Sequence, residues 1–196
     1  SSINTPNGTT SFAYDPTQTF VTQTTLPTPS SGVALSTSAT FDTTSTVPLS
    51  ATGMNAGETA SVKQYDSLLR PLVVALPNAG QITSVYYSPN DSGVSQSMGN
   101  GLSTNVRTLL DAYGRKSRVA IANGQGSNAW NQSDSCYDAA GLLQFQPTPY
   151  QGNGYPTPKV CSGNGTSYLY DALGRVTSSS NSDGTVSYQY LGRAVK

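Results

Sequence analysis

The segment that decides the fold is Tyr170-Asp171-Ala172-Leu173-Gly174-Arg175-Val176, because the chain repeats it with variations. Weaker copies begin at Tyr14 and Phe41. A pattern that returns at intervals of tens of residues predicts a repeat array. The clearest further copies are Tyr65-Asp66-Ser67-Leu68-Leu69-Arg70, Asp111-Ala112-Tyr113-Gly114-Arg115, Cys136-Tyr137-Asp138-Ala139-Ala140-Gly141-Leu142 and Tyr188-Gln189-Tyr190-Leu191-Gly192-Arg193.

The repeated order Asp-x-x-Gly predicts a tight turn between two strands. Asp at the first position of a type I turn accepts hydrogen bonds from nearby backbone N–H groups, and Gly at the fourth position adopts positive φ without strain. A type I turn followed by a left-handed Gly makes a hairpin with a bulge. The arginine after the Gly opens the return strand, where it could pair with the turn aspartate or lie over a neighbouring tyrosine ring.

A second kind of turn alternates with the first, as at Asn123-Gly124 and Asp183-Gly184. Asn-Gly and Asp-Gly are strong hairpin signals, so consecutive strands are expected to pair as an antiparallel meander. Its clearest part has strands at 59–65, 70–76 and 81–87, and the last repeat has strands at 166–170, 176–180 and 186–190. The segments near 88–105 and 146–165 are interpreted as irregular insertions. Because no linker divides the chain, residues 1–196 are expected to form a single repeat region.

The bulk composition narrows the class of protein. The chain has 196 residues, no net charge, 10% charged residues and 35% hydrophobic residues. No window has a helical period, so little or no helix is expected. The absence of a basic block argues against a nucleic-acid partner, and no apolar stretch approaches the roughly 20 residues that cross a bilayer. No signal peptide is recognisable, and both ends are expected to continue into a longer chain.

The two cysteines, Cys136 and Cys161, lie on either side of a stretch rich in Pro and Gly. A disulfide between them would close this excursion in an oxidising compartment and would stabilise the fold by about 3 kcal/mol. The alternative is a pair of free thiols. A thiol assay on the denatured protein distinguishes the two.

The order Tyr-Asp-x-x-Gly-Arg, followed by an apolar residue, resembles the YD repeat of the Rhs family. Members of this family are large secreted or surface proteins of bacteria, and their repeats are similar to those of animal teneurins. The resemblance covers most of the chain and is carried by Tyr65, Asp66, Arg70, Asp111, Gly114, Arg115, Tyr137, Asp138, Gly141, Tyr170, Asp171, Gly174, Arg175, Tyr188, Gly192 and Arg193. Departures such as Phe41 for Tyr and Leu69 for Gly concentrate in the N-terminal part.

This resemblance implies an all-β fold of consecutive hairpins that forms an open curved sheet, a fragment of an Rhs-type β-shell. In full-length relatives such a shell encloses a C-terminal toxin or forms part of an adhesion ectodomain. The family's self-cleavage region and its variable effector domain are not recognisable here.

The residue types argue against catalysis. The chain has no His, which removes the commonest general base and metal ligand, and its cysteines lack zinc spacing. Aspartates that recur in every repeat are interpreted as turn residues and not as a catalytic pair or a calcium site. Only Asp91 and Asp134 are assigned to loops outside this pattern. The recurring arginines are interpreted as a ladder with the turn aspartates and not as an anion site, so neither an enzyme nor a cofactor is expected.

Trp130 is the one candidate ligand contact, because it lies among amide side chains in Asn128-Ala129-Trp130-Asn131-Gln132. A flat aromatic ring beside amides is typical of sugar-binding surfaces. The alternative is that Trp130 packs over the sheet.

The expected function is structural. The chain would be a YD-repeat segment of a secreted or cell-surface protein, and its partners would be the neighbouring repeats and domains of the same long chain. The alternative is a module that binds a glycan or a protein through its curved face or its long loops. Neither nucleic acid nor membrane insertion is expected.

Overall fold

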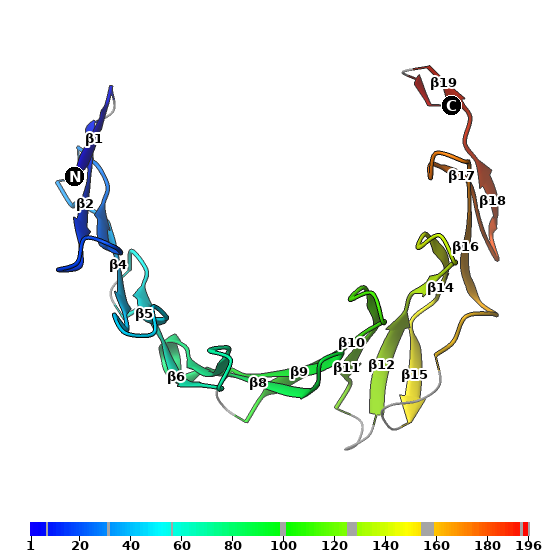
Figure 1. The fold of residues 1–196 in the computed structure, drawn as a ribbon, viewed down its shortest axis with the longest axis horizontal. Coiled ribbons are helices and arrows are strands. Elements are labelled where there is room, and N and C mark those ends of the chain that lie inside the picture. The colour runs from blue at the N-terminus through cyan, green and yellow to red at the C-terminus, as the bar shows by residue number, and fades with distance from the viewer. Residues whose placement is uncertain are drawn as a thin grey trace. The chain divides into compact units, whose positions relative to one another are not determined.

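The fold is described from a computed structural model, in which strands follow one another as hairpins from the N-terminus to the C-terminus (Figure 1). The structure describes residues 1–6, 8–30, 32–55, 57–98, 101–124, 129–153, 159–192 and 194–195. Arg193 of the last repeat, Lys196 and residues 154–158 of the second expected insertion lie outside this set. Within it, the only helical element is the single 3₁₀ turn Pro77–Ala79.

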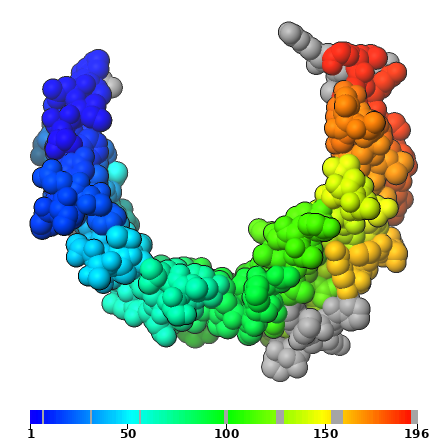
Figure 2. Space-filling view, viewed as in Figure 1, coloured from blue at the N-terminus to red at the C-terminus, as the bar shows by residue number. Residues whose placement is uncertain are grey.

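Contacts along the chain divide it into two compact units. The first contains Ser1–Val85 and Ser95–Ser103, and the second contains Tyr86–Val94 and Thr104–Lys196. The division therefore crosses three strands and does not coincide with a linker. In the space-filling view, the colours of the first unit succeed one another in the order of the sequence (Figure 2).

The first unit is built from antiparallel hairpins, and strand β8 leads into the second unit. These strands are β1 (Ser2–Thr5), β2 (Gly8–Tyr14), β3 (Val21–Thr25), β4 (Ser36–Phe41), β5 (Pro48–Thr52), β6 (Thr59–Tyr65), β7 (Pro71–Ala75) and β8 (Gln81–Ser88). Each strand from β2 to β7 pairs with the strands before and after it in the sequence. The prediction of an antiparallel meander is confirmed.

The strands that follow belong to three sheets. They are β9 (Asp91–Ser97), β10 (Ser103–Leu110), β11 (Lys116–Ala122), β12 (Ala129–Asp134), β13 (Cys136–Tyr137), β14 (Leu143–Pro147), β15 (Tyr150–Asn153), β16 (Gly165–Tyr170), β17 (Val176–Asn181), β18 (Gly184–Ser187), β19 (Tyr190–Leu191) and β20 (Ala194–Val195). Strands β1 to β12 and then β15 form one open sheet in that order, the order β13-β14-β16-β17-β18 forms a second, and β19 and β20 pair alone.

A register shift lies at the start of six of the seven predicted repeat turns. The pairing slips beside Tyr14, Phe41, Tyr65, Leu110, Tyr137 and Tyr170, the residues that stand immediately before the turn aspartates. This is the bulge that accompanies a type I turn closed by a left-handed residue. The bulge gives these repeats the same exit from the turn.

The two units differ in how much they bury. Among the described residues of the first unit, Asp15 alone is buried. The core lies in the second unit, where Ala120, Cys136 and Phe145 are buried together with several polar side chains. The first unit is therefore stabilised chiefly by its backbone ladder and cross-strand pairs, such as the row formed by Val62, Val74 and Ile82.

The segment 88–105, which we interpreted as a loop or an irregular hairpin, contains strand residues. It contains strand β9 and the start of β10, and the turn Pro89-Asn90 joins β9 to β8. Ser92 and Gly93 have little strand propensity, but Gly93 leaves room for the Tyr87 ring, since an added Cβ would lie 3.1 Å from that ring. Packing against neighbouring strands thus overrides local preference.

The last expected strand, 186–190, is also different. It divides into β18, which ends at Ser187, and β19, which begins at Tyr190. Within 146–165, the described residues include the end of β14, all of β15 and the first residue of β16. No helix in the described part of the chain is long and apolar enough to cross a membrane.

Candidate functional site

The recurring site is the turn itself, and its geometry is the same in three repeats. In the turn of Asp66, one carboxylate oxygen accepts the N–H groups of Leu68 and Arg70, each at 2.9 Å. The other oxygen accepts Arg70 Nε at 2.7 Å. The turns of Asp111 and Asp171 repeat these bonds to Arg115 and Arg175, again with 2.7 Å to Nε.

Two of these arginines also reach the next repeat. Arg115 Nη1 donates to Gly141 O at 2.8 Å, and its Cζ lies 4.0 Å from the centroid of the Tyr137 ring. The Cζ of Arg175 lies 4.3 Å from the centroid of the Tyr190 ring. A guanidinium at this distance over an aromatic face makes a cation–π contact. One side chain therefore closes its own turn and holds the following hairpin.

The tyrosine of the following repeat returns the contact. Tyr137 Oη donates to Lys116 O at 3.0 Å, and Tyr190 Oη donates to Val176 O at 2.8 Å. Both carbonyls belong to the residue directly after the arginine of the preceding turn. We call this two-way contact the clasp. In it, the turn side chain lies over the aromatic ring of the following repeat, and the hydroxyl of that tyrosine donates to the carbonyl after the turn.

Degenerate repeats keep parts of the clasp with other side chains. In the N-terminal unit, Phe20 stands where the arginine would be and Phe41 where the next tyrosine would be, and their rings stack with centroids 4.5 Å apart. Tyr65 Oη still donates to Pro48 O, and Tyr170 Oη donates to Leu143 O at 2.8 Å. Apolar stacking thus replaces the cation–π contact where the Gly-Arg pair is missing.

The carboxylates of the turns are held in the charged form. The N–H of Phe20 is the main cause that lowers the pKa of Asp15 to about 2, followed by the Thr17 hydroxyl. The pKa values of Asp66 and Asp171 are lowered first by the backbone N–H groups of Arg70 and Arg175. Hydrogen bonds to a carboxylate favour its ionised form. These groups are therefore charged turn formers and are not poised as general acids near neutral pH.

The last repeat uses a tyrosine other than the one predicted. Tyr190, and not Tyr188, lies under Arg175 and bonds to Val176 O. The Tyr188 hydroxyl instead lies 3.4 Å from Ser179 Oγ, and the backbone N–H of Tyr188 donates to Thr177 O. Gly192 has φ 63°, consistent with a turn directly after β19. The clasp of the last repeat is therefore made by the tyrosine two residues after the one predicted.

Asp91 and Asp134 are not loop residues, contrary to our assignment from sequence. Asp91 opens strand β9 and forms a two-bond ion pair with Arg107, whose Nε and Nη2 lie 2.9 and 2.6 Å from its oxygens. Arg107 Cζ also lies 3.9 Å from the centroid of the Tyr87 ring. The pair combines an ionic and an aromatic contact, as the turn arginines do, but outside any YD motif.

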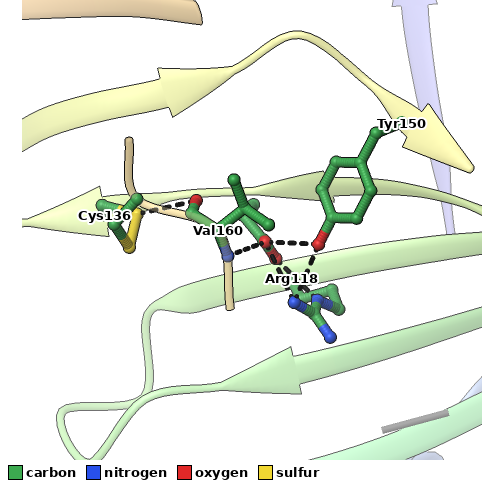
Figure 3. The surroundings of a disulfide bond; sticks show 6 residues. Arg118, Cys136, Tyr150 and Val160 are labelled. Atoms are coloured by element: carbon green, nitrogen blue, oxygen red, sulfur yellow. Dashed lines mark hydrogen bonds and ion pairs between the residues drawn. A yellow bond between two sulfur atoms is a disulfide. The ribbon is translucent and has the colours of Figure 1, made fainter. Parts of the chain in front are cut away.

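A second pair, Arg118 with Asp134, is buried (Figure 3). Arg118 Nε and Nη2 lie 2.6 and 2.9 Å from the two Asp134 oxygens, and Arg118 is 2% exposed while Asp134 is fully covered. Tyr150 Oη donates to Asp134 at 2.8 Å, and Val160 N–H donates to the same oxygen at 2.8 Å. Burial raises the pKa of Asp134, but the Arg118 hydrogen bonds and the other donors outweigh it, so the net pKa is lowered.

Sequence reasoning missed this cluster of Arg118, Asp134 and Tyr150. The signal that could have found part of it is strand alternation, since Arg118 occupies the same face as Ala120, and Asp134 the same face as Gln132. Register pairs Arg118 with Asp134 and Ala120 with Gln132 across the two strands. The pairing of Arg118 with Asp134, which are 16 residues apart, cannot be read from one short window.

The disulfide prediction is confirmed. Cys136 and Cys161 are bonded, with their Cα atoms 5.8 Å apart. The bridge fastens the described segment around Val160 beside the end of β12, where the Arg118–Asp134 pair lies (Figure 3).

Trp130 is half-buried on strand β12. Its cross-strand partners are Ala122 on β11 and Gly152 on β15, two small residues that leave space beside the indole. It shares a strand face with Gln132, which is buried. The indole therefore belongs in part to the packing of this sheet.

Two hollows lie between neighbouring repeats. In the first unit, a groove of about 570 Å³ is lined by Tyr14, Phe41, Gln23 and Thr40 among others. In the second unit, a cleft of about 340 Å³ separates the turn of Arg115 from the turn of Asp138. Within the described residues, no group of three His, Cys, Asp or Glu side chains is arranged to hold a metal ion.

No protein-family model matches the chain, and comparison with curated proteins found no significant match.

Proposed function

We propose that this chain is a structural YD-repeat segment of a large secreted or cell-surface protein, whose hairpins build a wall that encloses or presents another domain. The observation that supports this function is the clasp. The Asp, Arg and Tyr side chains that define the motif bond to their own turn or to an adjacent hairpin. These side chains serve to join one unit to the next, and no cofactor is required.

A wall of clasped repeats should accept one additional unit. Residues 170–189 form one complete unit, from the tyrosine before one turn to the residue before the next clasp tyrosine. If this unit is duplicated after Gln189, Arg175 of the first copy meets Tyr170 of the second copy, and Arg175 of the second copy meets Tyr190. Every clasp is thereby retained.

We expect the duplicated protein to remain a folded monomer, to gain strand signal in circular dichroism, and to unfold no more easily than the original. The matched control carries the same duplication with Asp171→Ala and Arg175→Ala in the added copy only. That control should unfold more easily or aggregate, because the added unit lacks its clasp. Aggregation of the duplicated protein would contradict the proposed wall of joined hairpins. Equal stability of the duplicated protein and its control would also contradict it.

The disulfide supports a location in an oxidising compartment. The test is to trap free thiols in intact producing cells, then reduce the protein and label again. A secreted or surface protein should show Cys136 and Cys161 labelled only after reduction, and protease added to intact cells should remove it. Labelling before reduction, together with protection from protease, would argue against this location.

The second candidate function is a carbohydrate- or protein-binding module. The groove of about 570 Å³ favours it, because the aromatic residues Tyr14 and Phe41 there stand beside the amide of Gln23. Cavities of this size, with a few polar groups on apolar walls, suit small ligands. A glycan array should then show a signal that Gln23→Ala removes and that Gln64→Ala, on β6 outside the groove, leaves intact. If no glycan binds, the carbohydrate form of this candidate fails.

A further inference from the structure

The disulfide and the buried ion pair meet at one backbone N–H group. Val160, whose N–H donates to Asp134 at 2.8 Å, directly precedes Cys161. Asp134 lies two residues before Cys136, the other half of the disulfide. The S–S bond therefore fastens this short segment to Cys136 on β13, and the hydrogen bond fastens it to Asp134 at the end of β12 (Figure 3).

The ion pair depends on being covered and on being fully hydrogen-bonded. A buried carboxylate and guanidinium lose their hydration, and this loss is offset only when the remaining hydrogen-bonding positions are satisfied. Asp134 receives bonds from Arg118, Tyr150 and Val160. Of these donors, Val160 is the one held in place by the disulfide, so opening the bridge frees that donor to leave.

We propose that Cys136–Cys161 is a redox-sensitive latch that keeps the Arg118–Asp134 pair closed and dry. Reduction by a dithiol supplies two electrons and two protons: the S–S bond breaks, two cysteine thiols form, and the dithiol closes to its own disulfide. The segment at Val160 then separates from β12, water reaches Asp134, and the rest of the second unit stays folded.

The latch implies a coupling that works in both directions. If the disulfide strengthens the hydrogen bonding around Asp134, then removing the Asp134 charge must change the stability of the disulfide by the same factor. The matched control is the Asp91–Arg107 pair. It is also a two-bond ion pair in the second unit, with 2.6 Å between Arg107 Nη2 and Asp91, but it joins β9 to β10, whereas the disulfide joins Cys136 to Cys161.

The first experiment compares amide hydrogen exchange in the oxidised protein and in the protein reduced with a dithiol. We expect exchange at Val160 to accelerate at least about tenfold on reduction, as local opening does. Exchange at Tyr188, whose N–H donates to Thr177 O at 2.9 Å within the same unit, should stay unchanged. Unchanged exchange at Val160 would overturn the latch, and so would an equal rise at Tyr188, because the whole unit would then open.

The second experiment measures Asp134→Asn in both redox states. Trp130, the only tryptophan, lies on β12 and reports unfolding of this region by fluorescence. We expect the substitution to raise the unfolding equilibrium constant by about 100-fold in the oxidised protein. After reduction, the rise should be at least about ten times smaller. Asp91→Asn should have the same effect in both states. Equal penalties for Asp134→Asn in the two states would overturn the proposal.

Discussion

The guanidinium of Arg115 lies 4.0 Å over the ring of Tyr137, while the same side chain holds Asp111 in its own turn and Gly141 O in the next. Two hairpins are thereby joined through one residue. The ring of Tyr113 also faces this guanidinium, at 5.1 Å. Several weak contacts meet at a partly buried charge, where each is worth more than it would be in open water.

Arg115→Ala should therefore destabilise the second unit by about 2 kcal/mol, the sum expected for one cation–π contact and charge-assisted hydrogen bonds. Arg115→Lys should recover less than half of this loss, because an ammonium group cannot match the forked geometry. Urea unfolding followed by Trp130 fluorescence measures both. Lys116→Ala, at the exposed neighbouring position, is the control and should change the stability by less than about 0.5 kcal/mol. Full recovery with Lys would contradict the role assigned to the fork.

Leu69 occupies the position where other turns have glycine, and its φ is 60°. A left-handed conformation costs a residue with a Cβ about 1 kcal/mol, so Leu69→Gly should stabilise the first unit despite the flexibility that glycine adds to the unfolded chain. Gly174→Ala, at φ 75° in the equivalent position, should destabilise the second unit by a similar amount.

Thermal unfolding of the two variants should show a higher melting temperature for Leu69→Gly and a lower one for Gly174→Ala. A Leu69→Gly protein that melts below the parent would show that the side chain of Leu69, which is half-exposed, contributes more by packing than its backbone costs.

Tyr170→Phe should cost about 1 kcal/mol, because it removes the 2.8 Å hydrogen bond to Leu143 O and leaves that carbonyl without its donor. Tyr168→Phe is the matched control, since the Tyr168 hydroxyl makes no hydrogen bond in the described part of the chain. Denaturant midpoints measured for both variants should separate them. Equal midpoints would show that the hydroxyl half of the clasp contributes nothing.

Acid should loosen the array through the turn aspartates. The pKa values of Asp15, Asp66 and Asp171 are lower in the folded protein than in the unfolded chain, with Asp15 at about 2 mainly because of the Phe20 N–H. Between the folded and the unfolded pKa values, the unfolded state binds more protons. The carboxylates therefore contribute their full stabilisation above about pH 4, and the free energy of unfolding falls as the pH drops toward about 2. Urea midpoints at neutral pH and near pH 2.5 check this. Asp66→Asn should flatten the decline, and a midpoint independent of pH would contradict it.

The local features of the fold could be predicted from the sequence because they depend on a few adjacent residues. The strand 59–65 and the turn at Asp66 appear as expected, since alternation and the Asp-x-x-Gly order act within one hairpin. The sequence pattern places the last repeat at Tyr188, because Gly192 and Arg193 follow it at the spacing of the motif. Only the position of Arg175, one hairpin earlier, distinguishes the two tyrosines.

The non-local features could not be predicted in the same way. Arg118 and Asp134 meet through the register of β11 and β12, and Val160 bonds to Asp134 next to the disulfide. Gly93 belongs to a strand in which the Tyr87 ring lies close to it. These contacts depend on tertiary pairing, which a single window of sequence does not contain.

The most direct test of the clasp is a double-mutant cycle between Arg115 and Tyr137, with Arg115→Ala, Tyr137→Leu and the double variant measured by urea unfolding. If consecutive hairpins are joined as described, the two losses should be non-additive, with a coupling of about 1 kcal/mol or more. Additive losses, with no coupling between the two residues, would contradict the account.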